Sequence, residues 1–165
     1  MHLPATDEDL LDQAIGAARH SPNRVRHVGA VLCPADGGAP VLGCNTFPQG
    51  VADTEDRHQG DGRFIWMEHA ERNALFAATR AGRATEGATL ASSYFPCCDC
   101  ARAIIASGIR HLVTLPPDLD DSVWGASFGP SLTMLREAGV QLRLSTRDAA
   151  QVHASSMLPP AAREG

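Results

Sequence analysis

The chain has 165 residues, of which 44% are hydrophobic and 20% are charged, a composition typical of one soluble globular domain with its own core. Its 14 Lys and Arg residues against 19 Asp and Glu residues give a net charge of −5, so the chain as a whole offers no general attraction for a nucleic-acid backbone. There is no apolar run of about 18 residues and no signal-peptide pattern, so we expect a cytoplasmic protein without a membrane partner.

The first part of the chain predicts a helix followed by a β-hairpin. Residues 7–19 place apolar side chains on one helical face, and Thr6 followed by Asp9 has the spacing of a capping box. Apolar runs at 28–32 and 41–42 flank an Asp-Gly-Gly turn, which is typical of a hairpin.

A long segment without a usable period, residues 47–65, follows the hairpin, and such a segment inside a compact domain is usually functional or mobile. Beyond it, we expect helices at 68–80, 101–107 and around 132–135, and strands at 88–93, 111–115 and 140–144. Strands linked by helices imply parallel crossovers, whereas the hairpin implies an antiparallel pair. The sequence therefore predicts an α/β fold, a three-layer α/β/α domain with a central mixed five-stranded sheet.

The end of the chain differs in composition from the rest. From residue 146 the sequence is rich in Ala, Ser and Pro, which is more typical of a tail or of an arm that contacts a partner than of a core. We therefore expect one domain over residues 1–145 and a C-terminal tail or arm over residues 146–165.

Two short motifs carry most of the chemical information, and each opens a predicted helix: His69-Ala70-Glu71 and Pro96-Cys97-Cys98-Asp99-Cys100. Cys97 and Cys100 are three positions apart, which directs both sulfurs to one side of a helical turn. With His69 they make three ligands of the kind that zinc prefers, and three protein ligands leave a fourth position for water, as in a catalytic site. Helix N-termini favour the thiolates. Glu71 is placed to carry protons for that water.

A closed structural zinc site would need a fourth protein ligand. The residues available are Cys98, Cys44, Cys33 and His58. We expect Cys98 to point away because its neighbour Cys97 points at the metal, and Cys33 and Cys44 lie in apolar strands where a free cysteine is typically a small core residue. His58 lies in the long segment, where we expect it to be solvated. A second metal or a substrate contact at His58 is the alternative.

The order of the motifs, H-x-E followed by P-C-x-x-C, resembles the signature of zinc-dependent nucleobase deaminases. Over residues 7–144 the chain is similar to the cytidine and deoxycytidylate deaminase family. Besides the two motifs, the matching segments are Val28-Gly29-Ala30-Val31, Gly43 with Asn45, Ile104-Ile105 and Gly108-Ile109. The resemblance implies the cytidine deaminase-like fold and an assembly of two or more identical chains.

The resemblance also implies roles for individual residues. His69, Cys97 and Cys100 would hold one catalytic Zn²⁺ ion per chain, and Glu71 would be the catalytic proton carrier. The implied substrate-binding residues are Asn45 near the sugar, the backbone N–H of Ala70 at the ring carbonyl, the small Ala30 where the base rests, and Phe95.

The segment Phe95-Pro96-Cys97 and the long insert before His69 resemble the deoxycytidylate deaminase-like branch of the family. One departure is that Asn45-Thr46 replaces the Asn-Gly pair often found in nucleotide-regulated members. Another is that no phosphate-binding constellation is evident, although four arginines are candidates: Arg24, Arg26, Arg57 and Arg63. Phe64 and Trp66 are candidates to stack on a substrate or to close its pocket.

The resulting hypothesis is a zinc-dependent hydrolytic deaminase. It would convert an amino group on a pyrimidine, in deoxycytidylate or a related cytosine nucleotide or nucleoside, to a carbonyl with release of ammonia. One alternative is a deaminase of a free base, such as guanine, a triazine or a modified or damaged base. Another is a non-catalytic, zinc-stabilised interaction module. The net acidity and the lack of a Lys- and Arg-rich tail disfavour a nucleic-acid partner.

Overall fold

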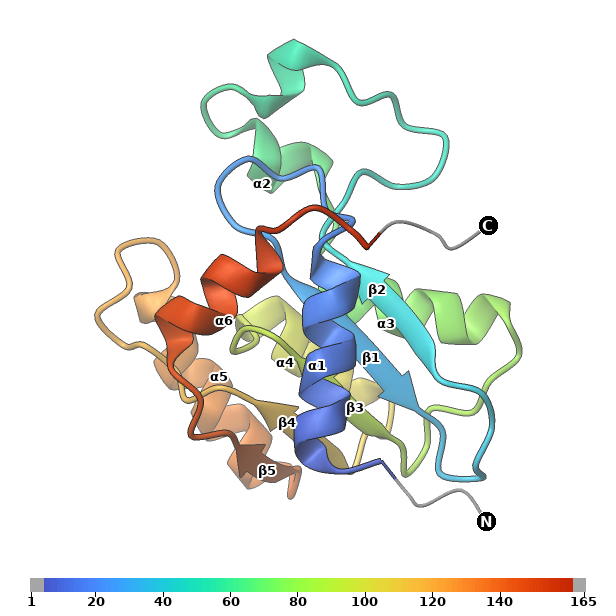
Figure 1. The fold of residues 1–165 in the computed structure, drawn as a ribbon. Helices are drawn as coiled ribbons and strands as arrows, with labels where there is room; N and C mark the ends of the chain where they lie inside the picture. The colour runs from blue at the N-terminus through green and yellow to red at the C-terminus, as the bar shows by residue number, and fades with distance from the viewer. Residues whose placement is uncertain (1–4, 162–165) are drawn as a thin grey trace.

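The computed structural model describes residues 5–161, in which helices and strands alternate along most of the chain. In chain order the elements are α1 (Asp7–Ala18), β1 (Gly29–Cys33), β2 (Val41–Cys44), the 3-10 helix η1 (Glu55–His58), α2 (Gly62–Trp66), α3 (Ala70–Arg80), β3 (Thr89–Ser92), α4 (Cys98–Ala106), β4 (His111–Thr114), α5 (Gly125–Glu137), β5 (Gln141–Leu144) and α6 (Ala149–Ser156) (Figure 1). No helix within this range is long and apolar enough to cross a membrane.

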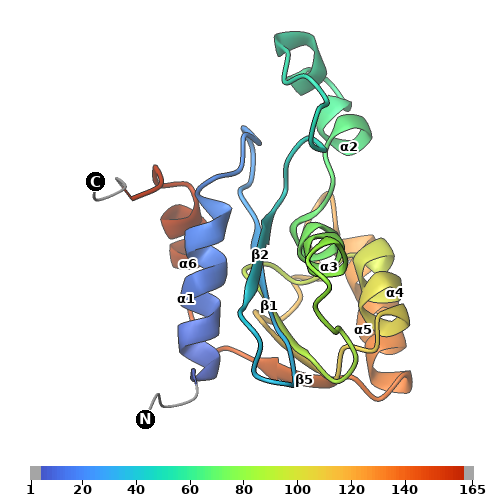
Figure 2. The ribbon, with the colours of Figure 1, turned by 90° about the vertical axis from the view of Figure 1, so that its right-hand side faces the viewer.

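The five strands form one mixed sheet in the order β2-β1-β3-β4-β5. Strand β1 is antiparallel to both β2 and β3, whereas β3, β4 and β5 run parallel to one another. Helices α1 and α6 cover one face of the sheet, and α3, α4 and α5 cover the other (Figure 2). The predicted three-layer α/β/α domain with a mixed five-stranded sheet is therefore confirmed.

Helix α1 begins at the predicted capping box. The Thr6 hydroxyl accepts a hydrogen bond from the backbone N–H of Asp9 at 3.1 Å, and the Asp9 carboxylate accepts one from the N–H of Thr6 at 2.8 Å. The helix packs so closely on β1 that a Cβ at Gly29 would clash with the carbonyl oxygen of Ala14. Glycine at this position therefore sets the distance between the helix and the sheet.

Helix α3 also lies close to the hairpin, on its opposite face. A Cβ at Gly43 of β2 would lie 2.6 Å from the carbonyl oxygen of Ala70, the first residue of α3. Its partner across the ladder, Ala30, is fully buried in the same core cluster as Ala70 and Ala74. Two small residues thus allow the first turn of α3 to rest on the sheet.

The segment without a usable period, 47–65, contains two short helices, η1 and α2, and projects beyond the sheet (Figure 1). Several contacts hold it together from within. His58 is hydrogen-bonded to Asp53, and Arg57 donates to the carbonyl of Ala52 at 2.7 Å. The Arg57 guanidinium also lies 4.0 Å from the centre of the Trp66 ring. These helices are shorter than the windows from which periodicity is read.

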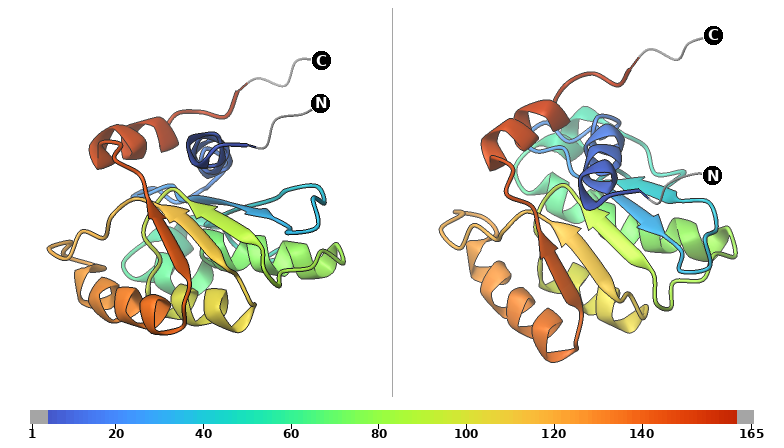
Figure 3. Two further views of the ribbon diagram at one scale, coloured as in Figure 1. Left: turned by 90° about the horizontal axis from the view of Figure 1, so that it is seen from below. Right: turned by 60° about the horizontal axis from the view of Figure 1, so that its bottom comes forward.

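The segment predicted as a tail or arm contains helix α6, which lies beside α1 on one face of the sheet (Figure 3). The Asp148 side chain caps its first turn by accepting from the N–H of Gln151 at 2.9 Å. Val152 and Ser156 are buried. The segment through residue 161 is therefore packed on the domain, and residues 162–165 of the predicted tail lie outside the described residues.

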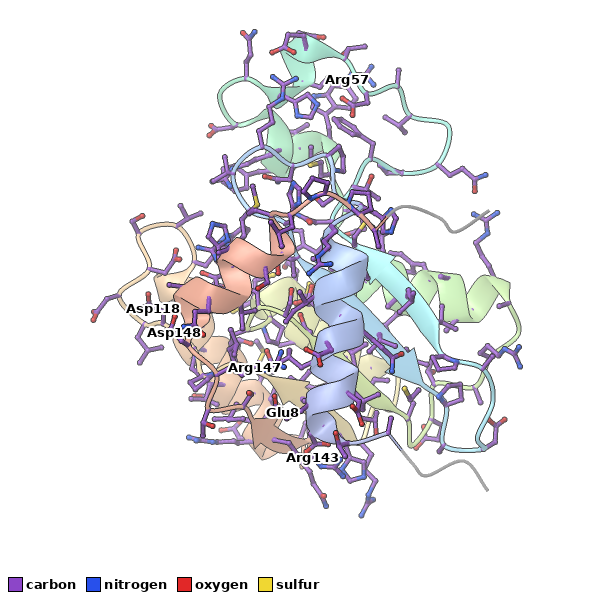
Figure 4. All side chains as sticks on the ribbon, viewed as in Figure 1. Glu8, Arg57, Asp118, Arg143, Arg147 and Asp148 are labelled. Atoms are coloured by element: carbon purple, nitrogen blue, oxygen red, sulfur yellow. The ribbon has the colours of Figure 1, made fainter. Side chains whose placement is uncertain are left out.

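Ion pairs link α1 to the C-terminal part of the chain. Arg147, just before α6, pairs with Glu8 at 2.8 Å and with Asp12 at 2.7 Å, and Figure 4 shows Glu8 and Arg147 between the two segments. Arg143 on β5 pairs with Asp7 at 3.0 Å. Exposed pairs of this kind each stabilise a fold by about 0–1 kcal/mol, so the buried apolar contacts of α1 and α6 dominate.

Candidate active site

Two helix N-termini meet at the end of β3 and bring the three predicted metal ligands together. His69 is the N-cap residue of α3, Cys97 is the N-cap residue of α4, and Cys100 lies in the first turn of α4. The Nδ1 atom of His69 is 3.5 Å from the Sγ atoms of both cysteines. Within residues 5–161 this is the only group of three or more such side chains with the geometry to hold a metal ion.

The spacing of the three ligand atoms fits zinc. Ligands at the Zn–S and Zn–N bond lengths on a tetrahedron are about 3.6 Å apart, which the 3.5 Å sulfur-to-nitrogen distances match. Two thiolates and one imidazole are also donors that favour zinc over magnesium or calcium. Both the donor set and the distances therefore indicate one Zn²⁺ ion.

The charges and hydrogen bonds around Cys97 and Cys100 favour binding of a cation by their sulfur atoms. A hydrogen bond from Cys100, together with the nearby imidazole of His69, lowers the pKa of the Cys97 thiol to about 4 despite its burial. The hydrogen bond to Cys97 and burial raise the pKa of the Cys100 thiol. One negative charge is thus shared between the sulfurs at neutral pH, where it attracts a divalent cation.

Glu71, the second residue of α3, is 3% exposed and faces the metal ligands. Its Oε2 atom is 3.5 Å from Sγ of Cys100, and its Oε1 atom is 3.1 Å from the hydroxyl of Ser92 at the end of β3. Burial raises the pKa of the Glu71 carboxyl, and a raised pKa agrees with the predicted role of a proton carrier. Sequence reasoning missed Ser92, which is brought here only by the sheet.

The alternative fourth ligands lie elsewhere. Cys98 points toward α5, where its Sγ is 3.1 Å from the carbonyl oxygen of Ser127 and its N–H donates to the Ser127 hydroxyl at 2.8 Å. This confirms the expected direction of Cys98. Cys33 and Cys44 on the hairpin are half-buried rather than in the core, and this burial raises the pKa of both thiols. His58 lies in the projecting segment, and the expectation that it is solvated is wrong: its side chain is 5% exposed and packs between Asp53 and the Phe47 ring.

A cavity with about 550 Å³ of free space, part of it open to solvent, lies in front of the metal ligands. Of the predicted substrate-binding residues, Asn45, Ala70 and Phe95 line it. Ala30 lies in the core beneath α3, and Val28 is the residue of that segment that lines the cavity.

Asn45 has a structural task as well as a place in the cavity wall. Its Oδ1 atom accepts a hydrogen bond from the N–H of Val28 at 2.8 Å, and its Nδ2 atom donates to the carbonyl of Arg26 at 2.9 Å. The amide thereby fixes the backbone that leads into β1. One N–H of the Asn45 side chain is left over for a substrate.

An aromatic group closes the cavity above the metal ligands. The Trp124 ring meets the His69 ring edge to face at a centroid distance of 5.3 Å, and it meets Phe64 of α2 in the same way at 5.6 Å. Phe64 lines the cavity as predicted, whereas Trp66 is outside the lining and lies under Arg57. Trp124 follows a loop far along the chain, and no local pattern in the sequence marks it.

Three side chains with the geometry to hold a zinc ion, a buried carboxylate beside them and a cavity with aromatic walls are the features of a hydrolytic zinc enzyme that acts on a small molecule. Residues 4–115 match the family model described as the cytidine and deoxycytidylate deaminase zinc-binding region. The chain belongs to the cytidine and deoxycytidylate deaminase family, and it is a zinc-dependent deaminase.

Individual relatives agree with this assignment. The chain is 35% identical over 117 residues to an uncharacterized deaminase encoded in the luxG 3′ region of Aliivibrio fischeri, an alignment that covers 70% of this chain and 76% of the relative. It is 26% identical over 148 residues to a probable deoxycytidylate deaminase of Drosophila melanogaster, which covers 83% and 70%. The dCMP deaminase of cyanophage S-TIM5, 21% identical, superimposes with a TM-score of 0.67 over 87% of this chain and 100% of that protein, and it shows that the fold is shared.

Proposed function

We propose that this enzyme hydrolyses the exocyclic amino group of a cytosine nucleotide, with deoxycytidylate as the first candidate, and releases ammonia. The family relationship and the relative named a probable deoxycytidylate deaminase support the pyrimidine. The cyanophage protein with the same fold has been solved with dCMP and dUMP. The observation that carries the nucleotide assignment is a pair of cavity arginines that form no ion pair with a carboxylate of residues 5–161.

The four candidate arginines divide into two pairs. Arg24 is held by both carboxylate oxygens of Glu55, with Nη2 at 2.6 Å, and Arg57 is used inside the projecting segment. Arg26 and Arg63 line the cavity, and within residues 5–161 neither forms an ion pair with a carboxylate. Guanidinium groups at the wall of a cavity that are not paired with a carboxylate are suited to bind a phosphate.

The reaction follows from how these side chains are placed. His69, Cys97 and Cys100 would hold a Zn²⁺ ion, which as a Lewis acid activates water for attack. Glu71 takes a proton as the water oxygen adds to the carbon that bears the amino group. It delivers that proton to the ring nitrogen, then takes the second proton from the hydroxyl now on the carbon and delivers it to the amino group, so that the carbonyl forms, the C–N bond breaks and ammonia leaves.

The remaining residues orient the base and exclude solvent. Ala70 begins α3, so its backbone N–H has no partner within the helix and is available to donate to the ring carbonyl oxygen. Asn45 offers its remaining N–H to the sugar. Phe64 and Trp124 cover the base and keep bulk water out, which strengthens these polar contacts.

The test is ammonia release by the zinc-loaded enzyme on deoxycytidylate, deoxycytidine, cytosine, guanine and ammeline, with Glu71→Ala as the blank. We expect kcat/KM for deoxycytidylate to exceed that for deoxycytidine at least about tenfold, since one charge-assisted contact stabilises a complex by roughly 1.5–3 kcal/mol. Turnover of free bases alone would favour the alternative, a free-base deaminase, and would contradict the nucleotide assignment.

We further propose that the enzyme works in the cytoplasm as a homo-oligomer. All five cysteines are free, and thiolate zinc ligands persist in a reducing compartment. Leu42 on the edge strand β2 and Phe76 on α3 are 54% and 52% exposed, which supports burial of apolar surface between chains. Light scattering coupled to size exclusion measures the state, and a monomer at micromolar concentration would contradict the proposal.

A further inference from the structure

The C-terminal helix α6 packs against the segment that carries Arg26. The Nδ1 atom of His153 lies 3.5 Å from Nη1 of Arg26. One residue further along that segment, Nδ1 of His27 is 3.1 Å from the carbonyl oxygen of Ser156, and the N–H of His27 donates to Sδ of Met157 at 3.3 Å. The end of α6 therefore contacts both the backbone and the side chains at positions 26 and 27.

The other side of the Arg26 guanidinium is also fixed. It lies 4.2 Å from the centre of the Tyr94 ring, and the Tyr94 hydroxyl donates to Oδ2 of Asp121 at 2.6 Å. Oδ1 of Asp121 accepts from the N–H groups of Val123 and Trp124, each at 2.8 Å. The Tyr94 ring under Arg26 is therefore linked through Asp121 to the loop that places Trp124 over the predicted metal ligands.

We propose that His153 is a positioning residue for substrate recognition: from α6, outside the cavity, it holds the guanidinium of Arg26 where it meets the anionic group of the substrate. This inference rests on the proposed function. Arg26 lines the cavity and His153 does not, so the histidine acts only through the arginine. An arginine held on both sides loses less conformational freedom when it binds an anion.

The protonation state of His153 agrees with this role. Burial, the charge of Arg26 and the neighbouring His27 lower the pKa of His153. The imidazole is therefore neutral at pH 7, and its Nδ1 atom is able to accept from the guanidinium rather than repel it.

The kinetic test compares His153→Ala with Gln151→Ala, an exposed position on the same helix, in the zinc-loaded enzyme. For His153→Ala we expect KM for deoxycytidylate to rise while kcat stays within about twofold, so that the preference for deoxycytidylate over deoxycytidine falls about threefold to tenfold. His153→Gln keeps an acceptor and restores part of the preference. Equal losses on nucleotide and nucleoside would overturn the proposal, since they would indicate general structural damage.

The coupling to Arg26 is tested by a double-mutant cycle. Arg26→Ala removes most of the preference for the nucleotide, and His153→Ala then has no further effect in that background. Additive losses from the two substitutions would mean that His153 acts independently of Arg26, which would overturn the positioning role.

A measurement without turnover tests the contact itself. In an NMR titration of the His153 ring, Arg26→Ala should raise the pKa of His153, because a neighbouring positive charge is removed, whereas Arg24→Ala should leave it unchanged. An unmoved pKa in the Arg26 variant overturns the positioning. A wild-type enzyme that treats nucleotide and nucleoside alike overturns instead the proposed function and the anion assignment, so the two failures are distinguishable.

Discussion

The hydroxyl of Ser92 lies 3.1 Å from Oε1 of Glu71 and 2.8 Å from the carbonyl oxygen of Tyr94. Ser92 ends strand β3, and Glu71 belongs to the first turn of α3. This one hydroxyl therefore links the sheet to Glu71, the proposed proton carrier. Ser92 thus orients the Glu71 carboxylate from strand β3, whereas Glu71 itself belongs to helix α3.

Glu71→Ala should retain zinc and lose turnover. General acid–base catalysis contributes about 10²–10⁴-fold, so we expect kcat to fall by at least about 10² while bound zinc stays near one ion per chain. Metal analysis and ammonia release on the same sample measure both. His69→Ala is the contrasting variant, in which zinc itself is lost. A fully active Glu71→Ala enzyme would contradict the assigned role.

Ser92→Ala should lower kcat and leave KM nearly unchanged. The lost hydrogen bond is worth about 1 kcal/mol, which corresponds to about a fivefold decrease in kcat if the bond orients Glu71 for proton transfer. Thr133→Ala, on the exposed side of α5, is the control for loss of a hydroxyl. If kcat is unchanged and only thermal stability falls, the contact is structural rather than catalytic.

Substitutions of Trp124 and Trp66 provide a matched pair that tests the role of an aromatic ring in the cavity wall. Trp124→Ala removes the ring that contacts both His69 and Phe64, so we expect kcat/KM to fall about tenfold or more with bound zinc retained. Trp66→Ala, which removes a ring outside the cavity lining, should change kcat/KM by less than about twofold. Equal effects of the two substitutions would show that Trp124 does not enclose the substrate.

The paired cysteines in Cys97-Cys98 should differ in their response to substitution. Cys97→Ser weakens zinc binding and lowers Tm, because a metal bound only by the native state stabilises it. Cys98→Ser keeps zinc, since that side chain faces Ser127. A chelator should lower the Tm of the wild-type enzyme and of Cys98→Ser, and zinc should restore it. Equal zinc loss in both variants would contradict the three-ligand set.

Acid should destabilise the fold partly through His153. Its pKa in the folded protein lies below the ordinary value of 6.5, so between these two values the unfolded chain binds more protons. The free energy of unfolding therefore decreases as the pH falls through that window. Urea titrations at several pH values should show a smaller decrease for His153→Gln than for the wild type. Identical pH dependence would mean that His153 does not contribute.

Local patterns in the sequence predict the elements that depend on local interactions. The capping box at Thr6, the hairpin and the two metal motifs at helix starts are all present in the structure. Helix α6 lies in the segment whose Ala-, Ser- and Pro-rich composition predicts a tail or arm, and it is stabilised by packing on the domain through Val152 and Ser156 rather than by a distinct pattern.

Long-range placements escape sequence reasoning for a different reason. Ser92 and Trp124 reach the site through sheet order and a distant loop, and neither belongs to a motif. At the start of β1 the family resemblance indicated Ala30, while Val28 is at the cavity wall. A two-residue shift along one strand changes which part of the strand meets the cavity, and that depends on where the adjoining helix ends its contact with the sheet.

Gly43 of the edge strand β2 lies close to the start of helix α3, so this strand restricts where the residues at the start of α3 can lie. A methyl group there would meet the carbonyl oxygen of Ala70 at 2.6 Å and push the start of α3 outward. Because His69 and Glu71 flank that residue, the metal ligand and the proton carrier would be displaced together. In a library of all single substitutions, position 43 should therefore be as intolerant as the zinc ligands, although it contacts neither metal nor substrate.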